Sequence, residues 1–508
     1  MPSSPPSRFT RPALAIWLAT LAIVLAARIL GPSDLGQNLD QSKTIAFTLD
    51  MVNHNQWILP RDGLGRLTRK PPMVNWVAAP IVAMGFHNEL ALKLPAVLSG
   101  VSISILIFFA ARFLFRRLNT DSETDPADPA DEADQSIAAH ATPLAMLTAA
   151  AWLASPSAIK HIYFMRPDIL FTALLAGGWF ASLILLTSSP KHPRRLALLI
   201  WLAAAAALLT KGPLAALIPL YLLLHILIIT PKGSRKQAFK RTGWQWGIPI
   251  MLILPAGWLW SAYELNPEHV RTALLGQELG SRMGRGGFSG IIEAALHNPA
   301  YFFERFLPWC LPAVLAITFK PSRRIRSHAM GPAVLWILLV FAATTLAGMN
   351  AGSYIMPAYP PAAILAVYAL YRLGLRSNPA RVFKATRSIA AFILISAALI
   401  AGREMTMSRG ARDHTGQNIK AFAYTVAQHI QSDPVRFNQM GDLPIASLLG
   451  KHQPGDTAAN ASHRWLIQPT SLNPSTTPIL TSAPLTTHNP TTGEPIANSI
   501  TISLYRLP

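Results

Sequence analysis

The stretch LALLIWLAAAAALLTKGPLAALIPLYLLLHILIIT, residues 196–230, decides what kind of protein this chain is. Two long apolar runs flank a single Lys-Gly-Pro interruption at residues 211–213. Because a helix needs roughly 20 apolar residues to cross a bilayer, the stretch predicts membrane-spanning structure. The interruption leaves two interpretations open: two short spans that meet at one face of the membrane, or one broken helix.

The composition of the whole chain indicates a polytopic membrane protein. Of its 508 residues 51% are hydrophobic and only 13% are charged, with a mean hydropathy of +0.32, whereas soluble proteins carry about 25% charged residues. The net charge of +20 would suggest a nucleic-acid partner in a soluble protein. Here the cations lie between apolar segments, so we expect membrane lipids and no nucleic acid as partners. The single cysteine, Cys310, allows no intrachain disulfide.

Apolar segments of spanning length recur along the chain, which predicts about 11–13 transmembrane helices in an all-α polytopic fold. The first begins near Ala13 and is interpreted as a retained span, because no clear signal-peptide cleavage site follows it. Further candidate spans lie at about 91–115, 141–160, 168–188, 196–210, 212–230, 244–262, 300–319, 330–347, 355–373 and 388–402.

The loops between these segments alternate in charge. Basic loops that fall on the side of the N-terminus are 116–117, 191–195, 232–241, 320–328 and 376–387. The opposite side receives 31–90, 263–299 and 350–352. Because Lys and Arg accumulate in cytoplasmic loops, the pattern predicts a cytoplasmic N-terminus and places the C-terminal region outside.

Two further regions differ from the apolar body. Hydropathy drops after residue 402, and alternating runs such as SITISLYRLP predict a small extramembrane α/β region over 403–508, separate from a membrane domain over 1–402. Residues 119–140 begin with the acidic, aromatic-free NTDSETDPADPADEADQS and are predicted as a disordered cytoplasmic insert.

Ionisable groups beside apolar spans are candidates for function. Asp40 follows the first span and could act as a general base on an acceptor; the alternative is a helix N-cap. Lys70 could neutralise a phosphate as a compact point charge, with Pro71 and Pro72 fixing the backbone direction. The alternative for Arg69 and Lys70 is an anchor at the membrane interface.

Five more charged residues follow on the same predicted side. Asp168 stands at the start of a helix, where negative charge is favoured; with Arg166 it could instead form a surface ion pair. Lys211 could hold an anionic group, or reach toward the interface. Glu278 and Arg282 have the spacing of a helical salt bridge; the alternative is that Arg282 binds a phosphate.

In this order the motifs resemble those of the GT-C glycosyltransferases that use polyprenyl-phosphate sugars, the group of the lipid A aminoarabinose transferases and protein O-mannosyltransferases. The resemblance runs over roughly residues 11–375. Its parts are LDQSKTIAFTLDMVNHNQWILPRDGLGRLTRKPPMVNW (39–76), RPDILF (166–171), LLTKGPLAALIP (208–219), GQELGSRMG (276–284), NPAYFFERFLPW (298–309) and GSYIMPAYPPAAIL (352–365).

The resemblance implies a GT-C fold in which residues 31–90 form an outer catalytic loop with juxtamembrane helices, and 73–86 form an interfacial helix rather than a span. It implies that Asp40 and Asp168 are both catalytic, Asp40 as the base and Asp168 as the second acidic position. Contacts to the lipid phosphate are implied for Lys70, Arg282 and Tyr354. Supporting positions are Lys43, Lys211 and Glu278.

The implied reaction moves a sugar from an undecaprenyl-type phosphate to a lipid A, glycolipid or protein acceptor. The implied location is the bacterial inner membrane, with the active site facing the periplasm. The alternatives are a lipid-linked-sugar flippase without chemistry and a catalytically degenerate member of the group. Neither a nucleotide-binding loop nor a Cys/His zinc cluster is present in the sequence, so we expect no cofactor; a divalent cation has no support.

Several positions depart from the pattern of the group. Gln41 stands where Glu follows the first Asp, Arg69 where Glu is common, and Leu279 where His is frequent. These departures surround the sugar and acceptor pocket, so they bear on the identity of the substrates rather than on the reaction class.

Overall fold

The structure is a computed structural model, and it describes residues 9–35, 38–62, 65–84, 89–118, 129–279, 287–318, 329–375, 382–408, 414–430, 435–437, 465–469, 471, 478–483 and 502–506.

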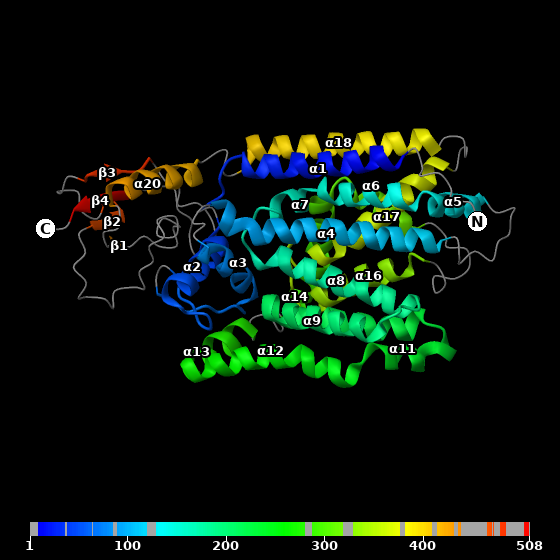
Figure 1. Ribbon diagram of the computed structural model, residues 1–508, viewed down its shortest axis with the longest axis horizontal. Coiled ribbons are helices and arrows are strands. Elements are labelled where there is room, and N and C mark those ends of the chain that lie inside the picture. Colours follow the sequence, from blue (N-terminus) through cyan, green and yellow to red (C-terminus); the bar gives the residue numbers. More distant parts are fainter. Residues whose placement is uncertain are drawn as a thin grey trace.

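Apolar helices run side by side along the long axis of the molecule (Figure 1). They are α1 (Thr10–Ile29), α4 (Glu89–Arg117), α6 (Ala141–Leu153), α8 (Pro167–Thr187), α9 (Pro193–Lys211), α12 (Trp244–Leu265), α16 (Gly331–Leu346), α17 (Tyr359–Leu375) and α18 (Val382–Met407). Further helices connect or extend them: α7 (Pro156–His161), α10 (Leu217–Leu224), α11 (Arg235–Thr242), α13 (Pro267–His269), α14 (Gly287–Phe306) and α15 (Cys310–Thr318). The expected all-α membrane architecture is confirmed.

Every span expected from the sequence overlaps helix, but the helices differ in length. Six helical segments of the described chain are long and apolar enough to cross a membrane, with Pro193–Ile229 counted as one. Others are shorter, such as α6 with 13 residues and α16 with 16. Prolines explain part of the difference, since α6 ends just before Pro156 starts α7. A count by length is therefore lower than the eleven to thirteen helices expected.

The stretch 196–230 is two antiparallel helices rather than one broken helix. Helix α9 ends at Lys211, which contacts Asp168 at the start of α8. Gly212 then adopts φ +72°, a conformation that favours glycine. After the short helix η1 (Gly212–Ala216), α10 runs antiparallel to α9. The evidence is that His225, directly after α10, lines the same cavity as Ser188, which directly follows the end of α8.

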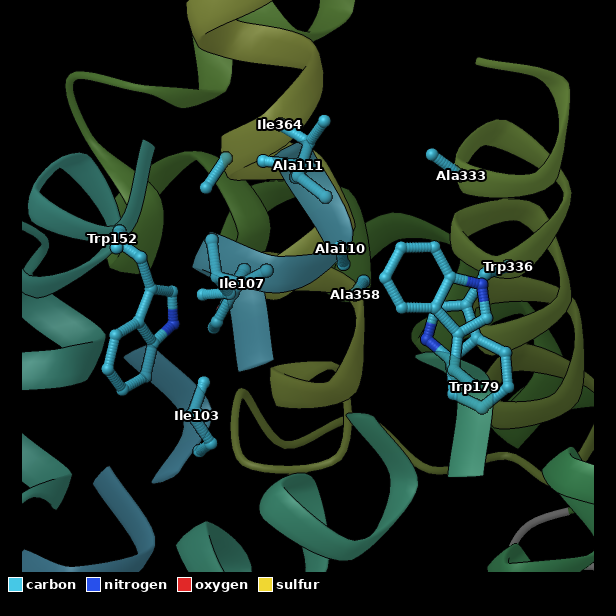
Figure 2. Close-up of a cluster of buried hydrophobic side chains, with 14 of the residues drawn as sticks. Ile103, Ile107, Ala110, Ala111, Trp152, Trp179, Ala333, Trp336, Ala358 and Ile364 are labelled. Atoms are coloured by element: carbon cyan, nitrogen blue, oxygen red, sulfur yellow. The ribbon is translucent and has the colours of Figure 1, made fainter. Parts of the chain in front are cut away.

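A buried aromatic and aliphatic core holds the helices together. The rings of Trp179 in α8 and Trp336 in α16 lie 6.2 Å apart, and Figure 2 shows Ala358 next to this pair, with Ile107 of α4 on the side of Trp152. The Trp336 indole donates a hydrogen bond to the backbone oxygen of Pro357 at 2.8 Å. Because lipid is as apolar as these side chains, close packing and such hydrogen bonds are what favour association of the helices.

Two short helices lie at one end of the bundle, here called the α2/α3 end (Figure 1). They are α2 (Leu39–His54) and α3 (Met73–Ala83), and they pack against each other through Ile45, Leu49 and Val74. With 11 residues, α3 is too short to cross a bilayer. The side chain of Asn75 in α3 donates to the Thr44 backbone oxygen of α2 at 2.7 Å, which fixes the two helices together.

The expected disordered insert is partly helical. Residues 119–128 of it lie outside the described residues, but Pro129–Ala139 form helix α5. Contacts with α17 explain the helix: Ile137 is fully buried, and the hydroxyl of Tyr368 donates to Asp134 at 3.1 Å. The acidic composition of this segment does not reveal these long-range contacts.

The C-terminal region contains helix α20 (Thr415–Ile430) and a four-stranded sheet of order β1-β2-β4-β3. The strands are β1 (Val435–Phe437), β2 (Trp465–Pro469), β3 (Leu480–Thr481) and β4 (Ile502–Arg506). Strand β2 pairs parallel with β1 and antiparallel with β4. Helix and sheet share a core that includes Ile419, Val426 and Leu504. The unit lies beyond the α2/α3 end of the bundle (Figure 1).

Candidate active site

Asp40 stands in the first turn of α2, but it does not cap the helix. The cap is Asn38, whose side-chain oxygen accepts from the backbone nitrogen of Gln41 at 3.2 Å. The Asp40 carboxylate instead accepts from Lys70 Nζ at 2.8 Å and from Arg166 Nη2 at 3.1 Å. The alternative interpretation of Asp40 as an N-cap is therefore wrong, and its carboxylate faces two cations from other segments.

Lys70 is held at this carboxylate by the chain just before α3. Its backbone nitrogen donates to the hydroxyl of Thr68 at 3.2 Å, and that hydroxyl donates to the Lys70 backbone oxygen at 3.1 Å. Pro71 and Pro72 follow and lead into α3. The Lys70 side chain keeps 35% of its surface exposed and that of Asp40 keeps 41%, so solvent and ligands reach this pair.

A second carboxylate, Asp168, is buried behind the first. It lies in the first turn of α8 with 1% of its surface exposed. Lys211 Nζ donates to one carboxylate oxygen at 2.5 Å, and Arg166 Nε lies 3.2 Å from the other. Asp168 and Arg166 thus do not form a surface ion pair, and Lys211 does not reach toward the interface.

Together these residues form a row of alternating charge, Lys70–Asp40–Arg166–Asp168–Lys211, with three cations and two carboxylates. Tyr354 lies at its buried end: Lys211 Nζ is 4.3 Å from the centre of the Tyr354 ring and 3.3 Å from the backbone oxygen of Ser353. A cation over an aromatic face is favourable in such a partly desolvated place. The row therefore connects α2, α8, α9 and the segment before α17.

The electrostatics of the row act on Asp40. Burial alone would raise the pKa of the Asp40 carboxyl, but the positive charges of Lys70 and Arg166 outweigh that effect and hold the pKa below its ordinary value. Asp40 is therefore a carboxylate at neutral pH. Any ligand that draws Lys70 or Arg166 away from it will raise its pKa.

A cavity of about 230 Å³ opens beside the exposed end of the row. Asp40 and Lys70 line it together with Lys43 and Arg69. Arg66 and Asp62 also line the cavity, where they pair with each other. The whole lining thus contains four Lys and Arg residues and two carboxylates. Arg69 stands where the resembled group has an acid, and in this cavity it adds to the positive surplus.

The structure brings six of the eight sequence-predicted site residues to the α2/α3 end of the bundle. Asp40, Asp168, Lys70 and Lys211 belong to the charge row, Tyr354 adjoins it, and Lys43 lines the cavity. Arg282 lies outside the described residues. Glu278 lies in the helix η4 (Val270–Leu279), but its side chain lies outside them.

Arg166 is the residue whose place in the site the sequence did not reveal. It joins the two carboxylates, yet its spacing to Asp168 suggests only a local ion pair. One sequence signal could have revealed this role: Arg166 directly precedes Pro167. A residue before proline favours an extended backbone, and Arg166 adopts one at the N-cap of α8, from which its side chain reaches α2. In the described part of the chain no group of three or more His, Cys, Asp or Glu could hold a metal ion.

Comparisons with known proteins place this geometry in context. No family model matches the chain. It is 26% identical over 365 residues to an uncharacterised protein of Aquifex aeolicus, which covers 68% of this chain and 62% of that protein. It is 23% identical over 403 residues to an undecaprenyl phosphate-α-4-amino-4-deoxy-L-arabinose arabinosyl transferase of Shewanella sediminis, covering 76% and 65%. The matched part is less than two thirds of either relative.

Solved structures show the fold. The crystal structure of ArnT from Cupriavidus metallidurans bound to undecaprenyl phosphate matches with a TM-score of 0.65 and 17% identity, over 98% of this chain and 97% of that one. The apo oligosaccharyltransferase of Archaeoglobus fulgidus matches with a TM-score of 0.53 and 11% identity, over 91% and 70%. The likeness to ArnT thus extends beyond residues 11–375. The chain is a multi-pass membrane protein with the GT-C fold of these transferases.

Proposed function

We propose that this protein is a glycosyltransferase that moves a sugar from a polyprenyl phosphate, of the undecaprenyl type, to an acceptor at the α2/α3 end of the bundle. The observation that carries the proposal is the row Lys70–Asp40–Arg166–Asp168–Lys211, whose exposed end opens into a positively charged cavity. A carboxylate beside cations, in the fold of an ArnT that binds undecaprenyl phosphate, suits transfer from a phosphate leaving group.

The cations serve the leaving group in this proposal. When the bond between the anomeric carbon and the phosphate oxygen breaks, its electron pair stays on the phosphate and the phosphate gains one negative charge. Lys70 is placed to stabilise that charge, with Lys43 and Arg69 in the same cavity. Tyr354 lies at the inner end of the row, and Arg282 is proposed as a further phosphate ligand on the resemblance alone, as is a supporting role for Glu278.

Asp40 is the proposed general base. The acceptor oxygen forms the new bond to the anomeric carbon and its proton passes to Asp40. In the free enzyme the cations make Asp40 a weak base, because they lower its pKa. A donor phosphate that competes for Lys70 and Arg166 raises that pKa, so Asp40 becomes a better base once the donor is bound.

Asp168 is proposed as a positioning residue rather than a group that touches substrate. It is almost fully buried and holds Arg166 from one side and Lys211 from the other. Removing one partner of such a buried pair leaves the other charge uncompensated, which is strongly destabilising. Lys211 in turn lies over the ring of Tyr354 and fixes the segment before α17.

We further propose a bacterial inner-membrane location, with the α2/α3 end facing the periplasm and lipid A, a glycolipid or a protein as acceptor. Support comes from the cations at the opposite end of the bundle. There α11 contains Arg235, Lys236, Lys240 and Arg241, and α4 ends with Arg116 and Arg117. Lys and Arg of this kind mark the cytoplasmic side. The proposed reaction needs no cofactor.

The test is an assay of purified, liposome-reconstituted protein against a panel of polyprenyl-phosphate sugars. Asp40→Asn removes the base and keeps the shape, so we expect a loss of transfer of at least about 100-fold. Glu264→Gln, at an exposed position near the end of α12, is the matched control and should keep full activity. If the wild-type protein binds undecaprenyl phosphate and releases sugar from no donor, the transferase is ruled out in favour of a flippase or a degenerate protein.

A further inference from the structure

Gln41, next to Asp40, is fully buried and makes three hydrogen bonds through its side-chain amide. Its nitrogen donates to the Asp34 carboxylate at 3.0 Å and to the Asp34 backbone oxygen at 3.2 Å. Its oxygen accepts from the backbone nitrogen of Met165 at 2.9 Å. The amide therefore connects the end of the α1–α2 loop with the segment just before α8.

The partners fix the direction of this amide. A backbone N–H only donates, so the atom that faces Met165 has to be an acceptor. The two Asp34 oxygens only accept while the carboxyl is ionised, so the atom that faces them has to be a donor. An ionised Glu at position 41 has only acceptor oxygens, and it would direct them at the two acceptor oxygens of Asp34 as well as at the one donor, the Met165 N–H. Gln is thus the residue that this pocket requires, in place of the Glu of the resembled group.

Asp34 is itself held firmly as an anion. Arg28 donates to one of its carboxylate oxygens at 2.6 Å, and Lys93 donates to the other. Burial alone would raise the pKa of Asp34, but the charges of Lys93 and Arg28 hold it below its ordinary value. The donor end of the Gln41 amide therefore rests on a fixed negative group.

The acceptor end of the amide reaches the other half of the site. Gln41 follows Asp40 in the chain, and Met165 precedes Arg166, while Asp40 and Arg166 form the 3.1 Å ion pair between the two segments. We propose that Gln41 is a positioning residue that fixes the separation of Asp40 and Arg166, and thereby aligns the base with the donor phosphate. This inference rests on the proposed transferase function.

The decisive variant is Gln41→Glu, measured between about pH 5 and pH 8. A protonated Glu can donate one hydrogen bond to Asp34 and accept from Met165, whereas an ionised Glu can no longer donate to Asp34. Burial and the negative charge of Asp34 raise the pKa of a Glu at position 41. The positive charges of Arg28 and Lys93, which contact Asp34 on its other side, oppose that shift. The charged groups facing Asp40 itself, Lys70 and Arg166, are unchanged.

We expect kcat of Gln41→Glu to approach the wild-type value at low pH and to fall by about 100-fold at high pH, since a misplacement of about 1 Å has that effect. KM for the donor should change little, because Lys70 stays in place. Gln428→Glu, which adds the same charge at an exposed position of α20, is the control and should follow the wild-type profile. A wild-type pH profile for Gln41→Glu, or a folded variant inactive at every pH, overturns the proposal.

A second measurement separates this inference from the proposed function. The apparent Tm of Gln41→Glu should match that of the wild type at low pH and fall below it as the pH rises, because an acid whose pKa is raised on folding destabilises the protein only once it ionises. This readout needs no substrate. If wild-type protein transfers no sugar while the Tm shift is present, the transferase fails and the hydrogen-bonding role of Gln41 stands. A Tm difference independent of pH contradicts that role.

Discussion

Two clusters of charged side chains lie at the α2/α3 end, and they differ in how their charges balance. The row from Lys70 to Lys211 has three cations for two carboxylates, and at its outer end both partners are more than one third exposed. The second cluster, here called the buried network, pairs three carboxylates with three cations, and four of its six side chains are at most 13% exposed. Its members are Arg28, Asp34, Glu89, Lys93, Glu404 and Lys420.

The difference teaches how to tell a binding site from a support. A set of ion pairs with balanced charges has no net attraction for an anion, whereas a surplus of positive charge with an open end attracts one. The buried network connects α1, α4, α18 and α20, so it fixes the C-terminal region to the bundle. Substitutions in the two clusters should therefore affect different properties.

The largest expected effect is on stability, from Lys93→Met. Lys93 is fully buried and pairs with both Asp34 and Glu89, so its loss leaves two buried carboxylates short of a partner. We expect a destabilisation of about 3–5 kcal/mol, seen as a lower apparent Tm in detergent. Lys236→Met, at an exposed position of α11, is the control. An unchanged Tm for Lys93→Met would show that the buried network does not support the fold.

Lys70→Met should have the opposite profile. We expect donor affinity to weaken by about 30-fold, equivalent to about 2 kcal/mol for a charged hydrogen bond, with little change in Tm. The measurement is binding of undecaprenyl phosphate to the reconstituted protein. Equal affinity in the variant and the wild type would show that Lys70 does not bind the donor and that the two clusters do not differ in the proposed way.

The same substitution should shift the acid limb of the rate profile. The pKa of Asp40 is lowered by Lys70, so its carboxylate stays ionised, and its stabilising ion pairs persist, until the pH falls through a value below the usual one of about 3.9. Without Lys70 that pKa rises, and the decline of kcat/KM on acidification begins at higher pH. An acid limb at the same pH in both proteins would show that Asp40 does not control it.

The smallest effect is expected at Lys420. Its side chain is 48% exposed although its partner Glu89 is buried, and Glu89 keeps Lys93 when Lys420 is changed. Lys420→Met should therefore lower stability by less than about 1 kcal/mol. Limited proteolysis between α18 and α20 gives a sensitive readout. A loss as large as that of Lys93→Met would mean that the buried network acts as one unit from α4 to α20.

The helices and most of the candidate site could be predicted from the sequence. The features that could not be predicted depend on contacts between residues far apart in the chain. Apolar runs and their lengths predicted the helices, and the order of motifs predicted that Asp40, Lys70 and Lys211 belong to one end. The pairing of Lys211 with Asp168, 43 residues away, could not be predicted because no local pattern encodes it. Arg28 and Lys93 were not singled out, since a lone cation near the end of an apolar span is usually an interfacial anchor. Helix α5 was not predicted because long-range contacts, such as that of Asp134 with Tyr368, hold it, and no local pattern encodes them.

The pairing of Lys211 with Asp168 also has a consequence for how the chain enters the membrane. Helices α8 and α9 follow each other directly in the chain. Asp168 lies in the first turn of α8 and Lys211 is the last residue of α9, so the start of α8 and the end of α9 lie side by side. A bare Lys or Asp on a span is costly to insert, by about 2.5–3.5 kcal/mol. Joined in one helical hairpin, the two charges enter as a neutral pair. We therefore expect the pairing of Asp168 with Lys211, which also supports Arg166 beside the proposed base Asp40, to lower the cost of inserting this hairpin.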